Sequence, residues 1–278
     1  MLAQNNYGKS GIRLVKVHRR GDTHDVTDVT VAVRFEGDFT AAHLTGDNAD
    51  VLPTDTMKNT VYARAKSHPL SDIESFGLDL GKHFLAGNPG VSLVTVTIVE
   101  HPWERLAVKD KPHPHAFRRA GQEVRTAVVT RTREGAVVEA GLDGILILKS
   151  TQSAFSGFRR DKYTTLTETR DRIFATSVTA RWRYSGTDVA FKTVGRGVRQ
   201  TLLETFAEHA SESVQHTLHA MGEAVLERHA EVEEVRLSLP NKHHILADLS
   251  PFGLENKNEI FVATDEPYGL IEATLKRG

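Results

Sequence analysis

Residues 71–99, SDIESFGLDLGKHFLAGNPGVSLVTVTIV, decide the fold class of this chain. Apolar residues recur in the first part at a helical period, at Ile73, Phe76, Leu80 and Phe84. Residues 87–90, Gly-Asn-Pro-Gly, then combine the residue types that end helices. Residues 91–99 are rich in β-branched side chains, which favour a strand. A helix followed at once by a strand predicts helices packed on a sheet.

The same alternation of strands and helices extends on both sides of this stretch. Towards the N-terminus, a hairpin is predicted from residues 11–21 and 26–37, and a helix follows the N-cap cluster Thr54-Asp55-Thr56. Beyond it, β-prone runs cover residues 111–119, 124–132, 136–139, 145–149 and 173–184. Two helical patterns, 188–208 and 211–229, precede strand-like residues 233–239 and 260–263. The order strand, strand, helix, helix, strand therefore occurs twice, which predicts an α+β chain built from two similar units. Glu134-Gly135 and Asp143-Gly144 are predicted to be turns.

Composition excludes several classes of function. The 278 residues include 35 Lys and Arg against 36 Asp and Glu, a net charge of −1, so we expect no nucleic-acid or membrane partner. The absence of cysteine excludes disulfides, thiolate metal sites and a cysteine nucleophile. The apolar run 91–99 is too short to span a membrane, and neither a signal peptide nor a C-terminal Ser-Lys-Leu is present. We therefore expect a soluble, cytoplasmic protein.

Histidines are the only side chains that suggest a metal. His113 and His115 alternate in KPHPH and would face the same side of an extended segment, as two ligands could. No carboxylate-rich third-ligand pattern accompanies them, so hydrogen-bonded strand or loop histidines are the alternative interpretation. The sequence also lacks a phosphate-binding loop, a dinucleotide fingerprint, HExxH and GxSxG.

Three short segments have a chemical interpretation beside an ordinary one. Lys9, at the start of the first predicted strand, would act as a base if burial lowered its pKa, or it is a surface lysine. Thr54-Asp55 and Val214-Gln215 begin predicted helices, whose backbone N–H groups can bind an anionic or carbonyl oxygen. Both could equally be ordinary helix caps.

Taken together, these segments resemble the urate oxidase (uricase) family. The matching segments are Tyr7-Gly8-Lys9 and residues 54–60, 81–84, 103–105, 111–117, 148–172, 205–207, 213–215 and 239–243. The most specific are LKSTQSAFSGFRRDKYTTLTETRDR at 148–172 and LPNKH at 239–243. Ser156 replaces a tryptophan that is frequent in eukaryotic members, and the peroxisomal tail is missing, which indicates the bacterial, cytoplasmic type.

The resemblance implies a fold, an assembly and a reaction. The family has the tunnelling fold, with two tandem ββααββ units that we place at residues 1–135 and 136–278. Its chains form homotetramers with active sites at subunit interfaces. Its members oxidise urate with O2 and water to 5-hydroxyisourate and hydrogen peroxide, with no metal and no organic cofactor.

The resemblance also implies the site residues. The proton-relay residues are Lys9, Thr54 and His243, and the substrate-binding residues are Thr54, Asp55, Phe155, Leu166, Arg172, Val214, Gln215 and Asn241. Arg172 and Gln215 would clamp one edge of urate, with a donor from the Val214 backbone, and Phe155 would stack on its plane. Thr54 and the Asp55 backbone would close the opposite edge. Leu166 would form an apolar wall, and Asn241 would hold O2 or water.

Two other interpretations remain open at this point. One is a purine or pterin enzyme of the same fold, such as a cyclohydrolase, which would need a zinc site and a glutamate anchor. The other is a purine-binding or structural assembly protein without catalysis. The presence of Lys9, Thr54 and His243 together argues against the second, because binding alone needs no proton relay.

Overall fold

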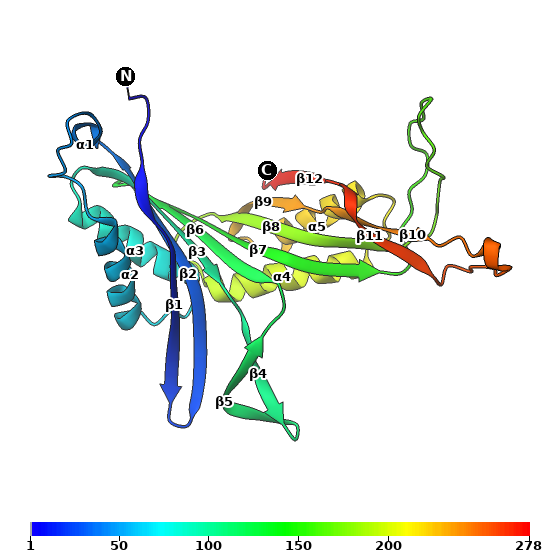
Figure 1. The fold of residues 1–278 in the computed structure, drawn as a ribbon, viewed down its shortest axis with the longest axis horizontal. Helices are drawn as coiled ribbons and strands as arrows, with labels where there is room; N and C mark the ends of the chain where they lie inside the picture. Colours follow the sequence, from blue (N-terminus) through cyan, green and yellow to red (C-terminus); the bar gives the residue numbers. More distant parts are fainter. Residues whose placement is uncertain (1) are drawn as a thin grey trace. The chain divides into compact units, whose positions relative to one another are not determined.

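The computed structural model of the protein describes residues 2–278 (Figure 1). Backbone contacts divide the chain into a first unit, residues 2–142 with Trp182–Gly195, and a second unit, Asp143–Arg181 with Arg196–Gly278. Both units combine helices with antiparallel strands, so the predicted α+β class is confirmed. The boundary between two repeats at residues 135 and 136 stays a prediction.

The first unit is built on a sheet with the antiparallel order β1-β2-β3-β6. Its strands are β1 (Tyr7–Arg20), β2 (Thr23–Gly37), β3 (Val91–Glu100) and β6 (Val124–Arg131). Its helices are α1 (Thr40–Leu44), α2 (Thr54–Ser67) and α3 (Ile73–Gly87). A separate hairpin pairs β4 (Trp103–Val108) with β5 (Lys111–Arg119).

The core of the first unit lies between this sheet and its helices. Alternate residues of β2 and β3 are buried, as expected for a sheet covered on one face: Val29, Val31, Val33, Phe35, Val94, Val96 and Ile98. The predicted apolar stripe of α3, including Phe76 and Leu80, is buried as well. Gly77 allows α3 to approach β6, because a Cβ there would lie 2.7 Å from a Val129 methyl group. Residues 71–99 thus form a helix packed on a sheet followed by a strand, as predicted.

The second unit contains the remaining elements. Its strands include parts of β7 (Ala136–Lys149) and β8 (Phe174–Tyr184), followed by β9 (Val232–Ser238), β10 (Asn241–Leu246), β11 (Phe261–Gly269) and β12 (Glu272–Lys276). Its helices are most of α4 (Phe191–Glu208), α5 (Val214–Arg228) and the short 3-10 helix Ser250–Phe252. Strand β10 pairs with both β8 and β11, and β9 pairs with β12. Between β7 and β8 runs the long loop of residues 150–173 (Figure 1).

One predicted turn is wrong. Glu134-Gly135 does form a turn, since the Thr132 N–H donates to the Gly135 carbonyl at 2.9 Å. Asp143-Gly144 instead lies inside the single strand β7. Gly144 adopts a φ of +75° there, which a glycine tolerates without ending the strand. The neighbouring Asp143 accepts a hydrogen bond from Arg181 of β8 at 2.7 Å, so its side chain links β7 to β8.

Among residues 2–278, no helix has the length and apolar character needed to cross a membrane.

Candidate active site

Lys9 lies near the start of β1, on the same face as Tyr7. Both side chains are half-buried, whereas Gly8 and Ser10 are exposed. Their partners on β2 are the buried residues Phe35 and Val33, so Lys9 emerges on the covered face of the sheet. The register breaks directly after Lys9, and Gly11 has a φ of +70°. A bulge of this kind re-aims the side chains beside it.

Helix α2 begins at Thr54 and leaves its first turn without a side-chain cap. Pro53 occupies the N-cap position, and no side chain accepts a hydrogen bond from the first turn. The Asp55 carboxylate is turned along the helix, where it accepts from Lys58 Nζ at 2.5 Å and Asn59 Nδ2 at 2.9 Å. The backbone N–H groups of the first turn, together with the positive end of the helix dipole, favour an oxygen ligand at the start of α2.

Lys9 is electrostatically coupled to this helix start. The hydrogen bond from Lys58 lowers the pKa of the Asp55 carboxyl, and the charge of Lys9 lowers it further. We refer to the predicted site residues Lys9, Thr54 and Asp55 together as the Lys9 half-site. All three belong to the first unit.

In the second unit, backbone hydrogen bonds join three segments around Phe155. The Ala154 N–H donates to the Ser211 carbonyl at 2.7 Å, and the Arg172 N–H donates to the Ser153 carbonyl at 2.9 Å. Phe155 and Thr169 exchange two hydrogen bonds, at 2.8 and 3.0 Å. The loop of residues 150–173 is thereby tied to the segment that leads into α5.

Arg172 is the most distinctive charged residue of this group. Its Nε atom is buried and has no hydrogen-bond partner, and no carboxylate within residues 2–278 forms an ion pair with it. Burial lowers the pKa of the guanidinium. Its central carbon lies 5.2 Å from the centre of the Phe155 ring. A partly desolvated guanidinium beside an aromatic ring is suited to a planar ligand with adjacent hydrogen-bond acceptors.

Helix α5 begins at Val214, three residues after the start of the predicted helical range 211–229. Ser213 caps it by accepting a hydrogen bond from the His216 N–H at 3.1 Å. Val214 is buried, whereas the Gln215 side chain is exposed on the first turn. The Gln215 amide is therefore accessible to a ligand.

Phe155 and Leu166 differ in how firmly they are held. Phe158 stacks on Phe155 with a centroid distance of 5.0 Å and an interplanar angle of 13°. Phe158 was not predicted to contribute, and no pattern in the sequence distinguishes it from its neighbours. Leu166 lies farther along the same loop and is 54% exposed.

Asn241 and His243 lie on β10 and are both half-buried. Asn241 pairs with Thr176 of β8 and with Gly269 of β11, and His243 pairs with Thr264 of β11. The register of β10 against β11 shifts between these two residues. Lys242, between them, forms an ion pair with Asp265 at 2.6 Å. Asn241 and His243 belong to the second unit, as do Phe155, Leu166, Arg172, Val214 and Gln215, and we refer to these seven predicted site residues as the Arg172 half-site.

The histidines of KPHPH lie close together on β5. The rings of His113 and His115 are 4.6 Å apart, and His113 Nδ1 accepts a hydrogen bond from the His115 N–H. Within the described residues, no group of three or more His, Asp or Glu side chains is arranged to hold a metal ion. The two residues are hydrogen-bonded histidines of a strand.

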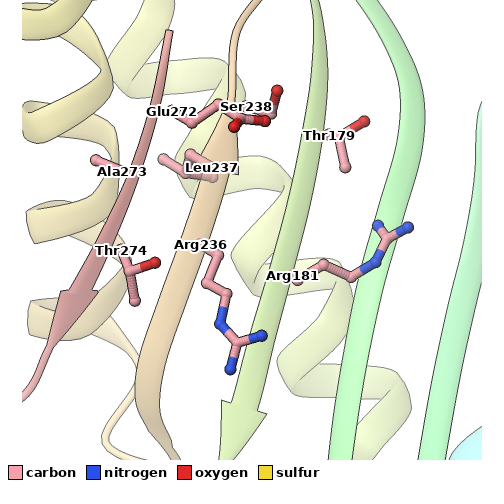
Figure 2. Close-up of a pocket in the computed structure, with 8 residues that line it drawn as sticks. All are labelled: Thr179, Arg181, Arg236, Leu237, Ser238, Glu272, Ala273 and Thr274. Atoms are coloured by element: carbon pink, nitrogen blue, oxygen red, sulfur yellow. The ribbon is translucent and has the colours of Figure 1, made fainter.

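A pocket of about 400 Å³ on the strands of the second unit is separate from these residues (Figure 2). It is lined by Thr179, Arg181, Arg236, Leu237, Ser238, Glu272, Ala273 and Thr274. Both of its arginines are neutralised, Arg181 by Asp143 at 2.7 Å and Arg236 by Glu234 at 2.6 Å. Arg172, which has no such partner, is the better candidate for binding an anion.

Known proteins resemble this chain along its whole length. The family model described as Uricase matches residues 5–130 and 138–272. The chain belongs to the uricase family. A uricase of Arthrobacter globiformis is 50% identical over 277 residues, which are 100% of this chain and 90% of that protein. A uricase of Dictyostelium discoideum is 42% identical, covering 99% of this chain and 97% of that one.

The structural comparison agrees with the uricase assignment. The crystal structure of uricase from Arthrobacter globiformis matches with a TM-score of 0.95, at 50% identity, and covers 100% of this chain and 95% of that one. The tunnelling fold and the resemblance to urate oxidases are thereby confirmed. The uricase family also favours the urate oxidase interpretation over a cyclohydrolase or a protein without catalysis.

Proposed function

We propose that this protein oxidises urate by O2 and water to 5-hydroxyisourate and hydrogen peroxide, without a metal or an organic cofactor. Membership of the uricase family supports urate as the substrate. The observation that carries the proposal is Arg172, a half-buried guanidinium with no carboxylate partner in the described chain. An anionic ligand would supply the missing charge.

The Arg172 half-site would hold the purine. Two parallel N–H groups of Arg172 would bind one edge of urate, the geometry in which a guanidinium binds most strongly. The Gln215 amide would take the neighbouring carbonyl and ring nitrogen, with the Val214 N–H as a further donor. The Phe155 ring would stack on the purine, which is favourable without requiring charge. Leu166 would close the site as an apolar wall.

The Lys9 half-site would complete the site from the opposite edge. Thr54 and the backbone N–H of Asp55 would contact the far side of urate, where the uncapped first turn of α2 favours an oxygen. In this proposal the Lys9 half-site comes from another chain of a homotetramer. Two-fold symmetry would then place two equivalent sites on each interface.

The reaction requires urate to become a strong electron donor. O2 is a triplet molecule and reacts slowly with closed-shell organic compounds, whereas a urate dianion is oxidised far more readily than neutral urate. Lys9, acting through the Thr54 hydroxyl and a water, would remove the proton, with His243 completing the relay. The dianion then transfers two electrons to O2, water adds to the purine, and two protons leave with the reduced oxygen as hydrogen peroxide. Asn241 would hold O2 or water above the ring, so that positioning supplies a large part of the rate.

The proposal is tested by adding urate to the purified protein in air. We expect urate absorbance to fall while one hydrogen peroxide appears for each urate consumed, and we expect Arg172→Ala to abolish most of both signals. A folded, oligomeric wild-type sample that binds urate without consuming it would support a binding protein instead.

A further inference from the structure

The Tyr7 hydroxyl connects the two segments that carry the Lys9 half-site. It accepts a hydrogen bond from the Leu52 N–H at 3.0 Å. Tyr7 precedes Lys9 by two residues on β1, and Leu52 precedes Thr54 by two residues at the entry to α2. One hydrogen bond therefore links the backbone that bears Lys9 to the backbone that bears Thr54.

The Tyr7 ring is held firmly by the core. It packs edge to face against Phe35, with centroids 5.7 Å apart, and against Phe39, with centroids 4.7 Å apart. Phe35 and Phe39 are themselves buried. Burial raises the pKa of the Tyr7 phenol, so it remains protonated at neutral pH. Since a tyrosine side chain has few rotatable bonds, the position of its hydroxyl is fixed by this packing.

Apolar packing also holds the entry to α2, because Val51 and Leu52 pack against the core, but few hydrogen bonds fix it. Pro53 has no N–H to donate, and no side chain caps the helix. Aspartate side chains often cap helices, but the Asp55 carboxylate accepts hydrogen bonds from Lys58 and Asn59 instead. Among the described residues, the Tyr7 hydroxyl is the side-chain group that is hydrogen-bonded to the backbone just before Thr54, in addition to the packing of Val51 and Leu52.

We propose that Tyr7 is a positioning residue for urate oxidation, holding the Thr54 hydroxyl in register with Lys9. The inference rests on the proposed proton relay. Tyr7 would not touch the substrate. It would act through the Leu52 backbone, because proton transfer through Thr54 requires alignment to within a fraction of an ångström.

The first measurement compares Tyr7→Phe with wild type in the full-length, assembled protein. This change removes the hydroxyl and keeps the ring. We expect kcat to fall by about 10-fold, within the loss that a misplacement of about 1 Å causes. KM for urate should change by less than about 3-fold, because Arg172 and Gln215 are untouched. Tyr62→Phe is the matched control, since Tyr62 lies on α2 and is exposed. It should leave kcat and KM unchanged.

The second measurement separates positioning from general stability. If Tyr7 acts through Thr54, then Tyr7→Phe should change kcat by less than about 2-fold in a Thr54→Ala background. A further 10-fold loss in that background, or a wild-type kcat for Tyr7→Phe alone, would overturn the inference and leave the relay intact. If Thr54→Ala and Lys9→Met themselves keep wild-type activity, the relay and the inference are both wrong.

Discussion

The guanidinium of Arg172 lies 5.2 Å from the centre of the Phe155 ring and forms no ion pair with a carboxylate in the described chain. Other arginines of this protein are paired with carboxylates, as Arg64 is with Asp79 and Arg13 with Asp28. A cation that is both partly buried and unpaired destabilises the empty site, and a bound anion removes that penalty. The pair formed by Arg172 and Phe155 therefore combines charge and a flat apolar surface, as a planar anion requires.

Arg172 substitutions test this pairing. Arg172→Ala should lower kcat/KM by at least about 100-fold, since each charge-assisted hydrogen bond contributes about 1.5–3 kcal/mol. Arg172→Lys should remain at least about 10-fold impaired, because a lysine keeps the charge and loses the two parallel donors. The control is Arg170→Ala, which removes an exposed arginine two residues away. Equal losses at positions 170 and 172 would indicate a general effect of charge on the loop.

Lys9 and Thr54 should behave as one base. We expect Lys9→Met and Thr54→Ala each to lower kcat by at least about 100-fold, at the lower end for loss of a general base. The double variant should be little worse than either single variant. Steady-state kinetics of the three variants, with Lys66→Met on α2 as a control, measure this. Fully multiplicative losses would mean that the two residues act independently.

Asp28 should link stability to pH. This carboxylate is 2% exposed and accepts hydrogen bonds from Arg13 at 2.9 and 2.8 Å and from Trp103 at 3.0 Å. Burial raises its pKa, but the hydrogen bonds from Arg13 and Trp103 outweigh this, so the pKa of folded Asp28 lies below the ordinary value. Its stabilisation is therefore present above the pKa of the unfolded chain, about 4, and is lost as pH falls through the lower folded value.

The corresponding experiment compares urea unfolding of wild type and Asp28→Asn. At pH 7 the variant should be less stable by about 1–3 kcal/mol, because its amide cannot replace the charged acceptor. This difference should shrink below about pH 4, where the Asp28 carboxylate of the unfolded chain begins to protonate before that of the folded protein. Asp22→Asn, in the exposed β1–β2 turn, should show neither effect. A difference that does not vary with pH would assign the loss to packing alone.

Removal of metals should leave urate oxidation intact. The proposed chemistry uses protein groups, substrate and O2 only, so exhaustive chelation should change kcat by less than about 2-fold. Loss of activity that one metal restores would contradict this prediction and favour a metal site at His113 and His115.

Local patterns predicted the fold well and the site only in parts. The period of Ile73, Phe76 and Leu80 was sufficient for α3, because a helix buries one stripe of its surface. The prediction of a turn at Asp143-Gly144 was wrong, because a dipeptide typical of turns can also lie within a strand when its glycine adopts a positive φ. Strands β4, β10 and β12 were missed, since their residues are polar or exposed and lack a clear alternation.

The site depends on contacts that a sequence pattern does not contain. The presence of both helices was predictable, but the predicted cap cluster Thr54-Asp55-Thr56 lies inside the first turn of α2, whose N-cap position is Pro53, and α5 begins at Val214 rather than at 211. The hydrogen bonds that join Ser153 to Arg172 and Ala154 to Ser211 connect loop residues far apart in the chain, so no local propensity encodes them. The resemblance to urate oxidases supplied the roles, and the structure supplied the partners, such as Tyr7 for Leu52.

The central claim is that urate is held between a Lys9 half-site and an Arg172 half-site from different chains. The most direct measurement mixes Arg172→Ala chains with Thr54→Ala chains, each inactive alone, by refolding them together. A mixed pair would have one site with both lesions and one site with neither. Random pairing makes about half of the pairs mixed, so roughly a quarter of wild-type activity should return. Verified mixed oligomers that remain as inactive as the separate variants would contradict the claim and place the whole site within one chain.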